Sequence, residues 1–207
     1  MLALETSLLQ EEDSSIIAVD EVGRGCIAGP LAVGAVYLTK ETLDSIAFAR
    51  DSKSMSAKRR KEMFDRLVQT GIPYSIGWVD AATVDEIGIT ASLHRAARLA
   101  LADLPDPTSY LLDGNIDFVS TPGSPDPRVV LQVKGDANCA SIAAASVLAK
   151  VSRDDVMFDY GRVYPGYGFH VNNGYGTKGH YHGIMNLGFS PIHRRSFKVP
   201  KWVTLPD

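Results

Sequence analysis

Four acidic side chains follow apolar, strand-like runs of this sequence. Asp20 and Glu21 come directly after the run IIAV, Asp113 ends the run SYLLD, and Asp136 ends the run RVVLQVKGD. One aspartate after a strand is usually a turn or a helix cap. Several are different, because strand ends of an α/β sheet meet at one edge, where sites usually lie. The four acids are therefore candidate ligands of one site.

Clustered carboxylates repel one another, so a site built from them needs a cation. Oxygen ligands with no accompanying Cys or His cluster suit Mg²⁺ or Mn²⁺ and not zinc. Two such ions, about 4 Å apart, are the usual apparatus for cleaving a phosphodiester. The acids thus predict metal-dependent phosphodiester hydrolysis, with no need for a serine or cysteine nucleophile.

The turn GRGCIAG, which begins at Gly23, allows a second interpretation as a dinucleotide-binding loop. That loop needs a helix N-terminus behind it to hold the phosphates. Here Pro30 and a strand-like run follow instead, and the acids before the turn would repel a pyrophosphate. The sequence disfavours a nucleotide cofactor.

The elements that must position these residues indicate an α/β domain with a mixed sheet. Residues 15–20 and 29–38 are predicted to form a hairpin, and further strands are expected at 73–79, 109–113 and 128–136. Helices are expected at 56–71, capped by Ser56, at 80–104 with a break near Gly88, and at 141–161. After residue 161 glycine and proline become frequent and the periodicity fades.

Composition is that of an ordinary globular protein: 207 residues, 45% hydrophobic, with a net charge of -3. No apolar run approaches a membrane span, and the N-terminus lacks the features of a secretory signal. Two cysteines, Cys26 and Cys139, are too few for a disulfide framework, so we expect a reducing, cytoplasmic setting.

Charge is unevenly distributed along the chain. Residues 160–206 contain no acidic residue but hold six lysines and arginines, four of the five histidines and five of the eight tyrosines. A basic, aromatic tail on an acidic body is typical of a polyanion-binding appendage. A solvated tail that merely packs on the domain explains the charge pattern equally well.

Several motifs, in order along the chain, resemble one known family. DEVGRG is similar to the DEAGRG signature of type 2 ribonuclease H, the bacterial ribonuclease HII family. DSKSMSAKRR, LLDGN, KGDANCASIAAASVLAKVSRD, GYGTKGH and HRRSF match further segments of that family, over roughly residues 15–200. Val22, Cys26, Gly88 and the pair Ser54-Met55 depart from the common pattern.

The resemblance implies a ribonuclease H-like mixed β-sheet flanked by helices, with a small helical C-terminal subdomain. We expect a catalytic domain at 15–160 and a basic substrate-binding subdomain at 161–207. The implied enzyme is an endonuclease that cleaves the RNA strand of RNA–DNA hybrids and nicks 5′ of single ribonucleotides in duplex DNA. Two-metal hydrolysis with Mg²⁺ or Mn²⁺ would leave 3′-OH and 5′-phosphate ends. We expect a cytoplasmic monomer that serves ribonucleotide excision repair and DNA replication, without the extra N-terminal domain of type 3 enzymes.

The resemblance also implies roles for individual residues. The catalytic metal ligands would be the four acids, Asp20, Glu21, Asp113 and Asp136. The nucleic-acid contacts would be the 2′-OH-sensing turn Gly23, Arg24 and Gly25, the phosphate-binding Lys53 and Lys150, and Tyr175, which would stack on the sugar at the RNA–DNA junction.

Each of these contacts has a structural alternative. The turn could be only a tight turn, the lysines ordinary exposed side chains, and the tyrosine a pin for the tail. Ser141 is expected to cap the long helix, and Asp154 and Asp155 to pair with basic residues one turn away. The segment His193-Arg194-Arg195 either contacts DNA or packs the tail onto the domain.

Two rival functions use other chemistry. A silent nucleic-acid-binding module would gain nothing from four clustered acids, and a phosphatase for small phosphoesters would not need the basic tail. Cleavage of a duplex carrying one ribonucleotide, with and without Mg²⁺, separates all three hypotheses.

Overall fold

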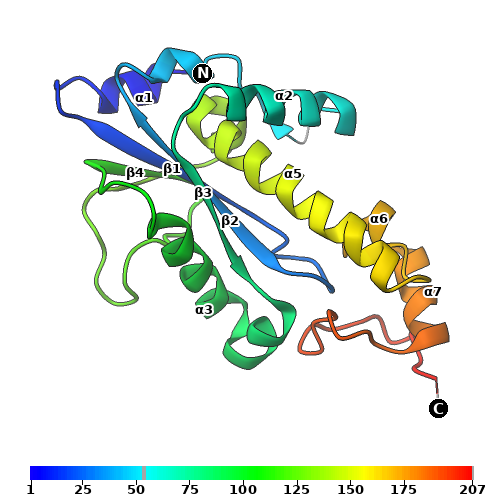
Figure 1. The fold of residues 1–207 in the computed structure, drawn as a ribbon. Helices are drawn as coiled ribbons and strands as arrows, with labels where there is room; N and C mark the ends of the chain where they lie inside the picture. Colours follow the sequence, from blue (N-terminus) through cyan, green and yellow to red (C-terminus); the bar gives the residue numbers. More distant parts are fainter. Residues whose placement is uncertain (53–54, 207) are drawn as a thin grey trace.

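A five-stranded mixed sheet forms the centre of the molecule (Figure 1). The computed structural model describes residues 1–52 and 55–206. The sheet has the order β3-β2-β1-β4-β5, in which β1 pairs antiparallel with β2 and parallel with β4. The strands are β1 (Ser15–Val22), β2 (Leu31–Thr39), β3 (Tyr74–Val79), β4 (Ser109–Asp113) and β5 (Val129–Gln132).

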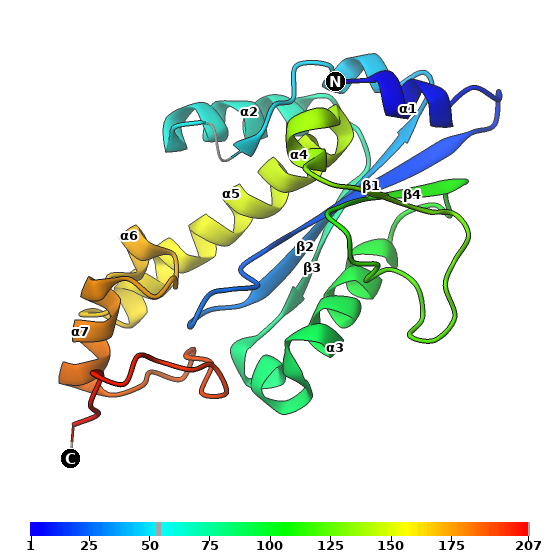
Figure 2. The same ribbon diagram turned by 180° about the vertical axis from the view of Figure 1, so that it is seen from behind.

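Helices cover both faces of this sheet, as Figures 1 and 2 show. The helical elements are α1 (Ala3–Leu8), the 3-10 turn η1 (Leu43–Ile46), α2 (Ala57–Gln69), α3 (Ala81–Leu101), α4 (Gly135–Asn138), α5 (Ala140–Val163), α6 (Phe169–Asn172) and α7 (Lys178–Leu187). Successive side chains of β1 point to opposite faces of the sheet, so the core has two parts. Ile16 packs in the apolar cluster that contains Leu148 of α5, and Ile17 packs in the cluster that contains Leu93 of α3. None of the helices in the described ranges is both long and apolar enough to cross a membrane.

Most of the predicted elements are confirmed. The first two strands form the expected antiparallel hairpin, and the Ser56 side chain caps α2 by accepting from the Arg59 N–H. The expected break in α3 lies at Gly88, whose φ of 78° and ψ of 162° interrupt the helix.

Two expectations about the strands are wrong. β5 ends at Gln132 instead of continuing to Asp136, because Lys134 adopts a left-handed conformation (φ 56°) that turns the chain into α4. Asp136 therefore lies in a short helix. Asp20 and Glu21 lie within β1 and not after its end, since the strand continues to Val22.

The expected cap of the long helix is also wrong. α5 begins at Ala140, so Ser141 is already inside the helix. Its N–H and hydroxyl both donate to Oε1 of Glu5, at 3.0 and 2.8 Å. The buried carboxylate of α1 thus supplies the acceptor that we expected from Ser141 and places negative charge at the helix N-terminus.

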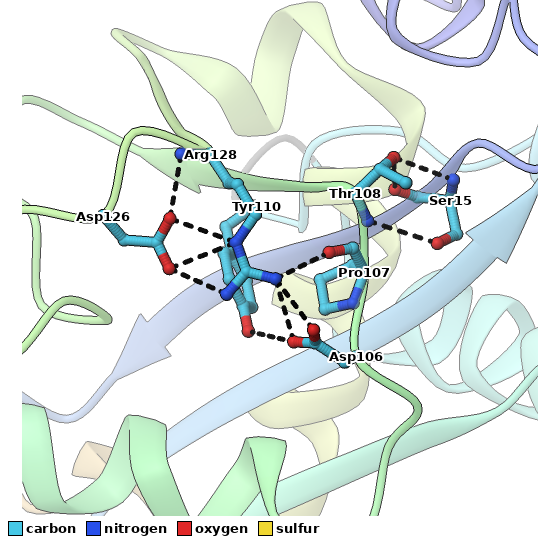
Figure 3. A network of polar contacts seen from close by, with 7 residues as sticks. All are labelled: Ser15, Asp106, Pro107, Thr108, Tyr110, Asp126 and Arg128. Carbon is cyan, nitrogen blue, oxygen red and sulfur yellow. Dashed lines mark hydrogen bonds and ion pairs between the residues drawn. The ribbon is translucent and has the colours of Figure 1, made fainter.

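A polar network lies at the opposite end of β4 from its acidic last residue (Figure 3). Arg128 forms ion pairs with Asp106 and Asp126, at 2.9 and 2.8 Å. The Thr108 hydroxyl donates to the carbonyl of Ser15 at 2.7 Å and ties β4 to β1. These contacts fix the register of β4, and with it the place of the acid at its far end.

The C-terminal segment folds back against the end of α5, where α6 and α7 lie in Figures 1 and 2. Its apolar cluster joins Phe169 and Ile184 to Met157 of α5 and to Ile27 and Ala28 from the loop before β2. The predicted domain boundary between residues 160 and 161 falls inside α5. The division into two domains stays a prediction.

Candidate active site

The sheet register brings the acids of β1 and β4 to neighbouring positions. Val19 pairs with Leu112, so Asp20 and Asp113 follow side by side on adjacent parallel strands. Asp113 accepts a hydrogen bond from the N–H of Gly135 at 2.7 Å, which places the next residue, Asp136, close to it. The structure therefore brings acids from β1, β4 and α4 to one end of the sheet.

Burial and mutual repulsion shape the electrostatics of this cluster. Desolvation raises the pKa of Glu21, the nearby charge of Asp113 raises it further, and the Arg24 guanidinium, 3.6 Å away, opposes both. Asp20 and Asp136 are buried, at 5% and 6% exposure. Oδ1 of Asp20 accepts the N–H of Glu21 at 2.8 Å. Such a cluster favours a bound cation, which would offset the repulsion.

The donor set fits a hard divalent cation, because all four candidate ligands are carboxylates. Within residues 1–52 and 55–206, no three acidic, histidine or cysteine side chains already stand as a metal cage. The assignment of the four acids as ligands therefore stays a prediction that rests on donor chemistry and proximity.

A groove of about 260 Å³ opens beside Asp20 and Glu21. The nucleic-acid contacts expected from the sequence that the structure describes all line it: Gly23, Arg24, Gly25, Lys150 and Tyr175. Lys53 lies outside the described residues, and Asp113 and Asp136 are not among the lining residues. The turn, the lysine and the tyrosine, far apart in the sequence, thus share one surface with two of the acids.

The turn needs glycine at its first position. Gly23 has a φ of 86°, and a Cβ there would run into the guanidinium of Arg153 and lie 2.9 Å from the carbonyl oxygen of Pro30. Gly25 has open space around it. Gly25 therefore leaves room at its Cβ position for a molecule in the groove.

Two buried arginines hold this turn and the loop after it. Arg194 donates to the carbonyl of Gly23 at 2.7 Å and to that of Gly29 at 2.9 Å. Arg153 donates to the carbonyls of Pro30 and Asn173, both at 2.8 Å. Both side chains are almost completely buried, so their positive charges are satisfied by main-chain oxygens and not by substrate.

The structure shows which residues of the segment HRRSF pack the tail onto the domain. His193 and Arg194 are buried and pack the tail onto the domain. Arg195 is exposed, while its N–H donates to Asp85 at 2.8 Å. A role in contacting nucleic acid remains open only for Arg195.

Lys150 and Tyr175 differ in how they are held. Lys150 forms an ion pair with Asp154 one turn along α5, as expected for that aspartate. Asp155 instead forms its ion pair with Lys61 of α2, at 3.9 Å. Tyr175 is 42% exposed, a large fraction for an aromatic side chain that only fastens a tail.

Three further lining residues were missed. Ser52 and Ser146 both line the groove, and their hydroxyl oxygens are hydrogen-bonded to each other at 3.0 Å. Arg60 donates to the carbonyl of Ser52 at 2.9 Å. Ser52 and Arg60 both lie in the segment DSKSMSAKRR, whose basic helix is the signal for Arg60, whereas Ser146 lies among the small residues of α5 and carries no comparable signal.

Both cysteines are free and buried, as expected. Burial raises the pKa of the Cys26 thiol, and burial together with the charge of Glu5 raises that of Cys139 to about 12. Thiols with raised pKa values are poor nucleophiles at neutral pH, which agrees with packing roles.

Comparison with known proteins gives the family. Residues 17–200 match the family model described as Ribonuclease HII. The chain belongs to the ribonuclease HII family. A ribonuclease HII of Leuconostoc mesenteroides subsp. mesenteroides is 43% identical over 192 residues, which are 88% of this chain and 69% of that protein. Members of the ribonuclease HII family are metal-dependent endoribonucleases that act on RNA–DNA hybrids, and so the chain is a metal-dependent endoribonuclease.

Solved structures confirm the fold expected for a ribonuclease HII. Ribonuclease H2 from Pyrococcus horikoshii OT3 matches with a TM-score of 0.72 and 26% identity, covering 89% of this chain and 94% of that one. Bst-RNase HIII in complex with Mn²⁺ matches with a TM-score of 0.64 and 22% identity, covering 90% of this chain and 66% of that one. The second likeness shows the fold alone.

Proposed function

We propose that this enzyme nicks duplex DNA on the 5′ side of a single embedded ribonucleotide, besides cleaving the RNA strand of RNA–DNA hybrids. The observation that carries the proposal is the shared groove, in which the turn 23–25 and Tyr175 stand beside Asp20 and Glu21. A site for one ribonucleotide needs a group that recognises RNA next to a group that cuts. In this groove the turn and the tyrosine would recognise the ribonucleotide, and the acids would hold the metal that cuts beside it.

The turn is suited to recognise the 2′-OH, the one sugar group that separates RNA from DNA. Arg194 holds its main chain by donating to the carbonyls of Gly23 and Arg24, while the space outside Gly25 is open. A sugar can therefore approach the main chain closely at a fixed position. Tyr175 offers an exposed ring that can cover a deoxyribose and a hydroxyl that can bond to a polar neighbour.

Asp20, Glu21, Asp113 and Asp136 would hold Mg²⁺ or Mn²⁺, with two ions when substrate is bound. Such ions lower the pKa of a bound water and stabilise the charge that develops on the leaving 3′ oxygen. The acids supply the negative charge that keeps the ions in place, and Arg24 moderates that charge at Glu21. The products would carry 3′-OH and 5′-phosphate ends.

The basic tail would contribute affinity for the duplex. Arg162, Lys178, Arg195, Lys198 and Lys201 are all exposed. Contacts between such side chains and phosphates release counterions, so binding should weaken as salt increases. We propose that the enzyme works in this way as a cytoplasmic monomer, in ribonucleotide excision repair and DNA replication.

The test uses three labelled duplexes of the same sequence: all DNA, DNA with one ribonucleotide, and DNA paired with a full RNA strand. With Mg²⁺ or Mn²⁺ we expect a single nick 5′ of the ribonucleotide, whose upstream fragment is extended by a polymerase because it ends in 3′-OH. Without metal there should be no nick. Cleavage of the full RNA strand but not of the single-ribonucleotide duplex would overturn the proposal, as would a nick on the 3′ side.

A further inference from the structure

Two histidines lie buried against each other in the C-terminal segment. His180 of α7 is fully buried and His193 is 2% exposed. Their Nε2 atoms are 3.0 Å apart. The rings of Tyr167 and Phe169 lie against both of them, which excludes water from the pair.

The hydrogen bonds around this pair allow one arrangement of protons. The N–H of Ser190 donates to Nδ1 of His193 at 2.8 Å, so that nitrogen is an acceptor. Neutral His193 then carries its proton on Nε2 and donates it to Nε2 of His180. His180 consequently carries its proton on Nδ1, which donates to the carbonyl of Tyr175 at 2.8 Å.

Burial supports the neutral state of both rings. Desolvation lowers the pKa of His180. Desolvation, with the neighbouring His180 next, lowers that of His193 to about 4. At neutral pH the chain of donors therefore runs in one direction, from Ser190 to Tyr175.

This chain ends on the main chain of a residue that lines the groove. The carbonyl of Tyr175 also accepts the N–H of Thr177, and its own N–H donates to Asn172, both at 2.9 Å. The carbonyl of the preceding residue accepts the N–H groups of Ile27 and Ala28, at 2.9 and 3.2 Å. The peptide units on both sides of Tyr175 are thus fixed, while its ring is left exposed beside the acids.

We propose that His180 and His193 are positioning residues for Tyr175, acting as a neutral pair of imidazoles, each in one tautomer, that fixes the Tyr175 carbonyl and so aims its ring into the groove. The proposal rests on the function proposed above, because the ring needs a substrate to act on. The alternative is that the pair only holds the tail together, in which case its loss would lower stability without changing substrate choice.

Two substitutions at His180 separate these possibilities. In His180→Asn the amide nitrogen takes the place of Nδ1, so the donor to Tyr175 is kept and the link to His193 is lost. In His180→Gln the amide lies at the place of Nε2, so the link is kept and the donor to Tyr175 is lost. Both variants lose one buried hydrogen bond, and each therefore controls for the stability loss of the other.

The measured quantity is kcat/KM for the single-ribonucleotide duplex divided by that for the full RNA–DNA hybrid, together with Tm. We expect His180→Asn to keep the wild-type ratio and His180→Gln to lower it about threefold to tenfold, the effect of one misplaced hydrogen-bonded contact. In a Tyr175→Ala background, His180→Gln should not lower the ratio further. Equal ratios in both variants, with similar losses of Tm, would overturn the proposal.

A second measurement needs no variant and no substrate. Nitrogen-15 NMR of the wild-type imidazoles at pH 7 should show the Nδ1–H tautomer for His180 and the Nε2–H tautomer for His193. Any other tautomer, or a charged ring, would contradict the pair as described. If the wild-type enzyme does not nick the single-ribonucleotide duplex, the proposed function fails, and the tautomers still decide whether the pair holds Tyr175.

Discussion

At the scale of single residues, the acids and the buried arginines have different roles. The acids are candidate metal ligands, and the arginines support the loops beside them. Asp113 combines two tasks, since it is a candidate metal ligand and also accepts the N–H of Gly135 at the start of α4. Arg194 is buried and holds the carbonyls of Gly23 and Arg24, at 2.7 and 3.2 Å. Both residues lie in motifs of the sequence, but the contact of Arg194 with the turn, 171 positions away, is seen only in the structure.

Asp113→Asn is expected to lower cleavage about a hundredfold or more, because an amide removes the charge that would hold a cation. The fold should survive, since Asn keeps an oxygen that can accept the Gly135 N–H. The measurement is kcat/KM on the hybrid together with Tm. Asp155→Asn, at an exposed acid on the same helix as Lys150, should leave cleavage unchanged. Near wild-type cleavage by Asp113→Asn would remove this acid from the site.

Arg194→Lys is expected to destabilise the fold by about 2–3 kcal/mol, because one ammonium group cannot reach the three carbonyls that the guanidinium fork serves. The loosened turn should also reduce discrimination between RNA and DNA. Urea denaturation and cleavage of the all-DNA duplex measure the two effects. The exposed Arg195→Lys is the control. An unchanged midpoint would show that the buried contacts contribute little.

At the scale of elements, the strands and long helices follow from the sequence, and the short helix α4 does not. The strands of β1 and β2 are almost continuous apolar runs, which a buried sheet requires. The run RVVLQVKGD predicts a strand throughout, but Lys134 leaves the extended region and starts a helix. No propensity predicts a left-handed lysine, because this conformation is uncommon for any residue other than glycine. The choice of Asp136 as a metal ligand therefore stays a prediction, while its predicted place at the end of a strand is wrong.

The kink of α3 offers a test of local backbone geometry. Gly88 has φ 78° and ψ 162°, a region almost restricted to glycine. A Cβ there would meet nothing within 4 Å, so any cost of substitution comes from the backbone alone. Gly88→Ala is expected to destabilise by about 1–3 kcal/mol, measured by urea denaturation.

The matched control is Gly179→Ala in α7, where a Cβ also meets nothing within 4 Å and the backbone is helical. It should be neutral or stabilising by about 0.5–1 kcal/mol. If the two alanine variants had the same free energy of unfolding, backbone strain at the kink would not explain why glycine stands at position 88.

At the scale of the whole molecule, the tail and the body form one structure. The charge pattern suggested an appendage, and five basic residues of the tail are indeed exposed. Its core, however, is shared with Ile27, Ala28 and Met157 of the body. Sequence periodicity could not predict this, because the tail has little regular structure and its contacts reach across most of the chain.

The buried histidines should make stability depend on pH. In the unfolded chain His193 titrates near 6.5, and in the folded protein burial lowers its pKa to about 4. Between these values the unfolded state binds more protons, so stability rises with pH, by up to about 1.4 kcal/mol per pH unit for one proton. The contribution is complete above pH 6.5 and is lost as the pH falls toward 4.

The measurement is the free energy of unfolding from urea titrations between pH 4 and pH 8. His193→Gln should flatten the curve in this range, whereas the exposed His182→Gln should leave its slope unchanged. A wild-type slope that persists in His193→Gln would assign the titration to other groups.

The contact between Arg194 and Gly23 joins residues 171 positions apart. During synthesis the N-terminal hairpin leaves the ribosome long before Arg194, which supports the turn after β1, has been made. A nascent chain can therefore assemble most of the sheet and present its acids while the turn beside them is still unsupported. Only when residue 194 has been made and has folded back is that turn fixed. The groove is therefore completed only near the end of translation, after its acids have already been made.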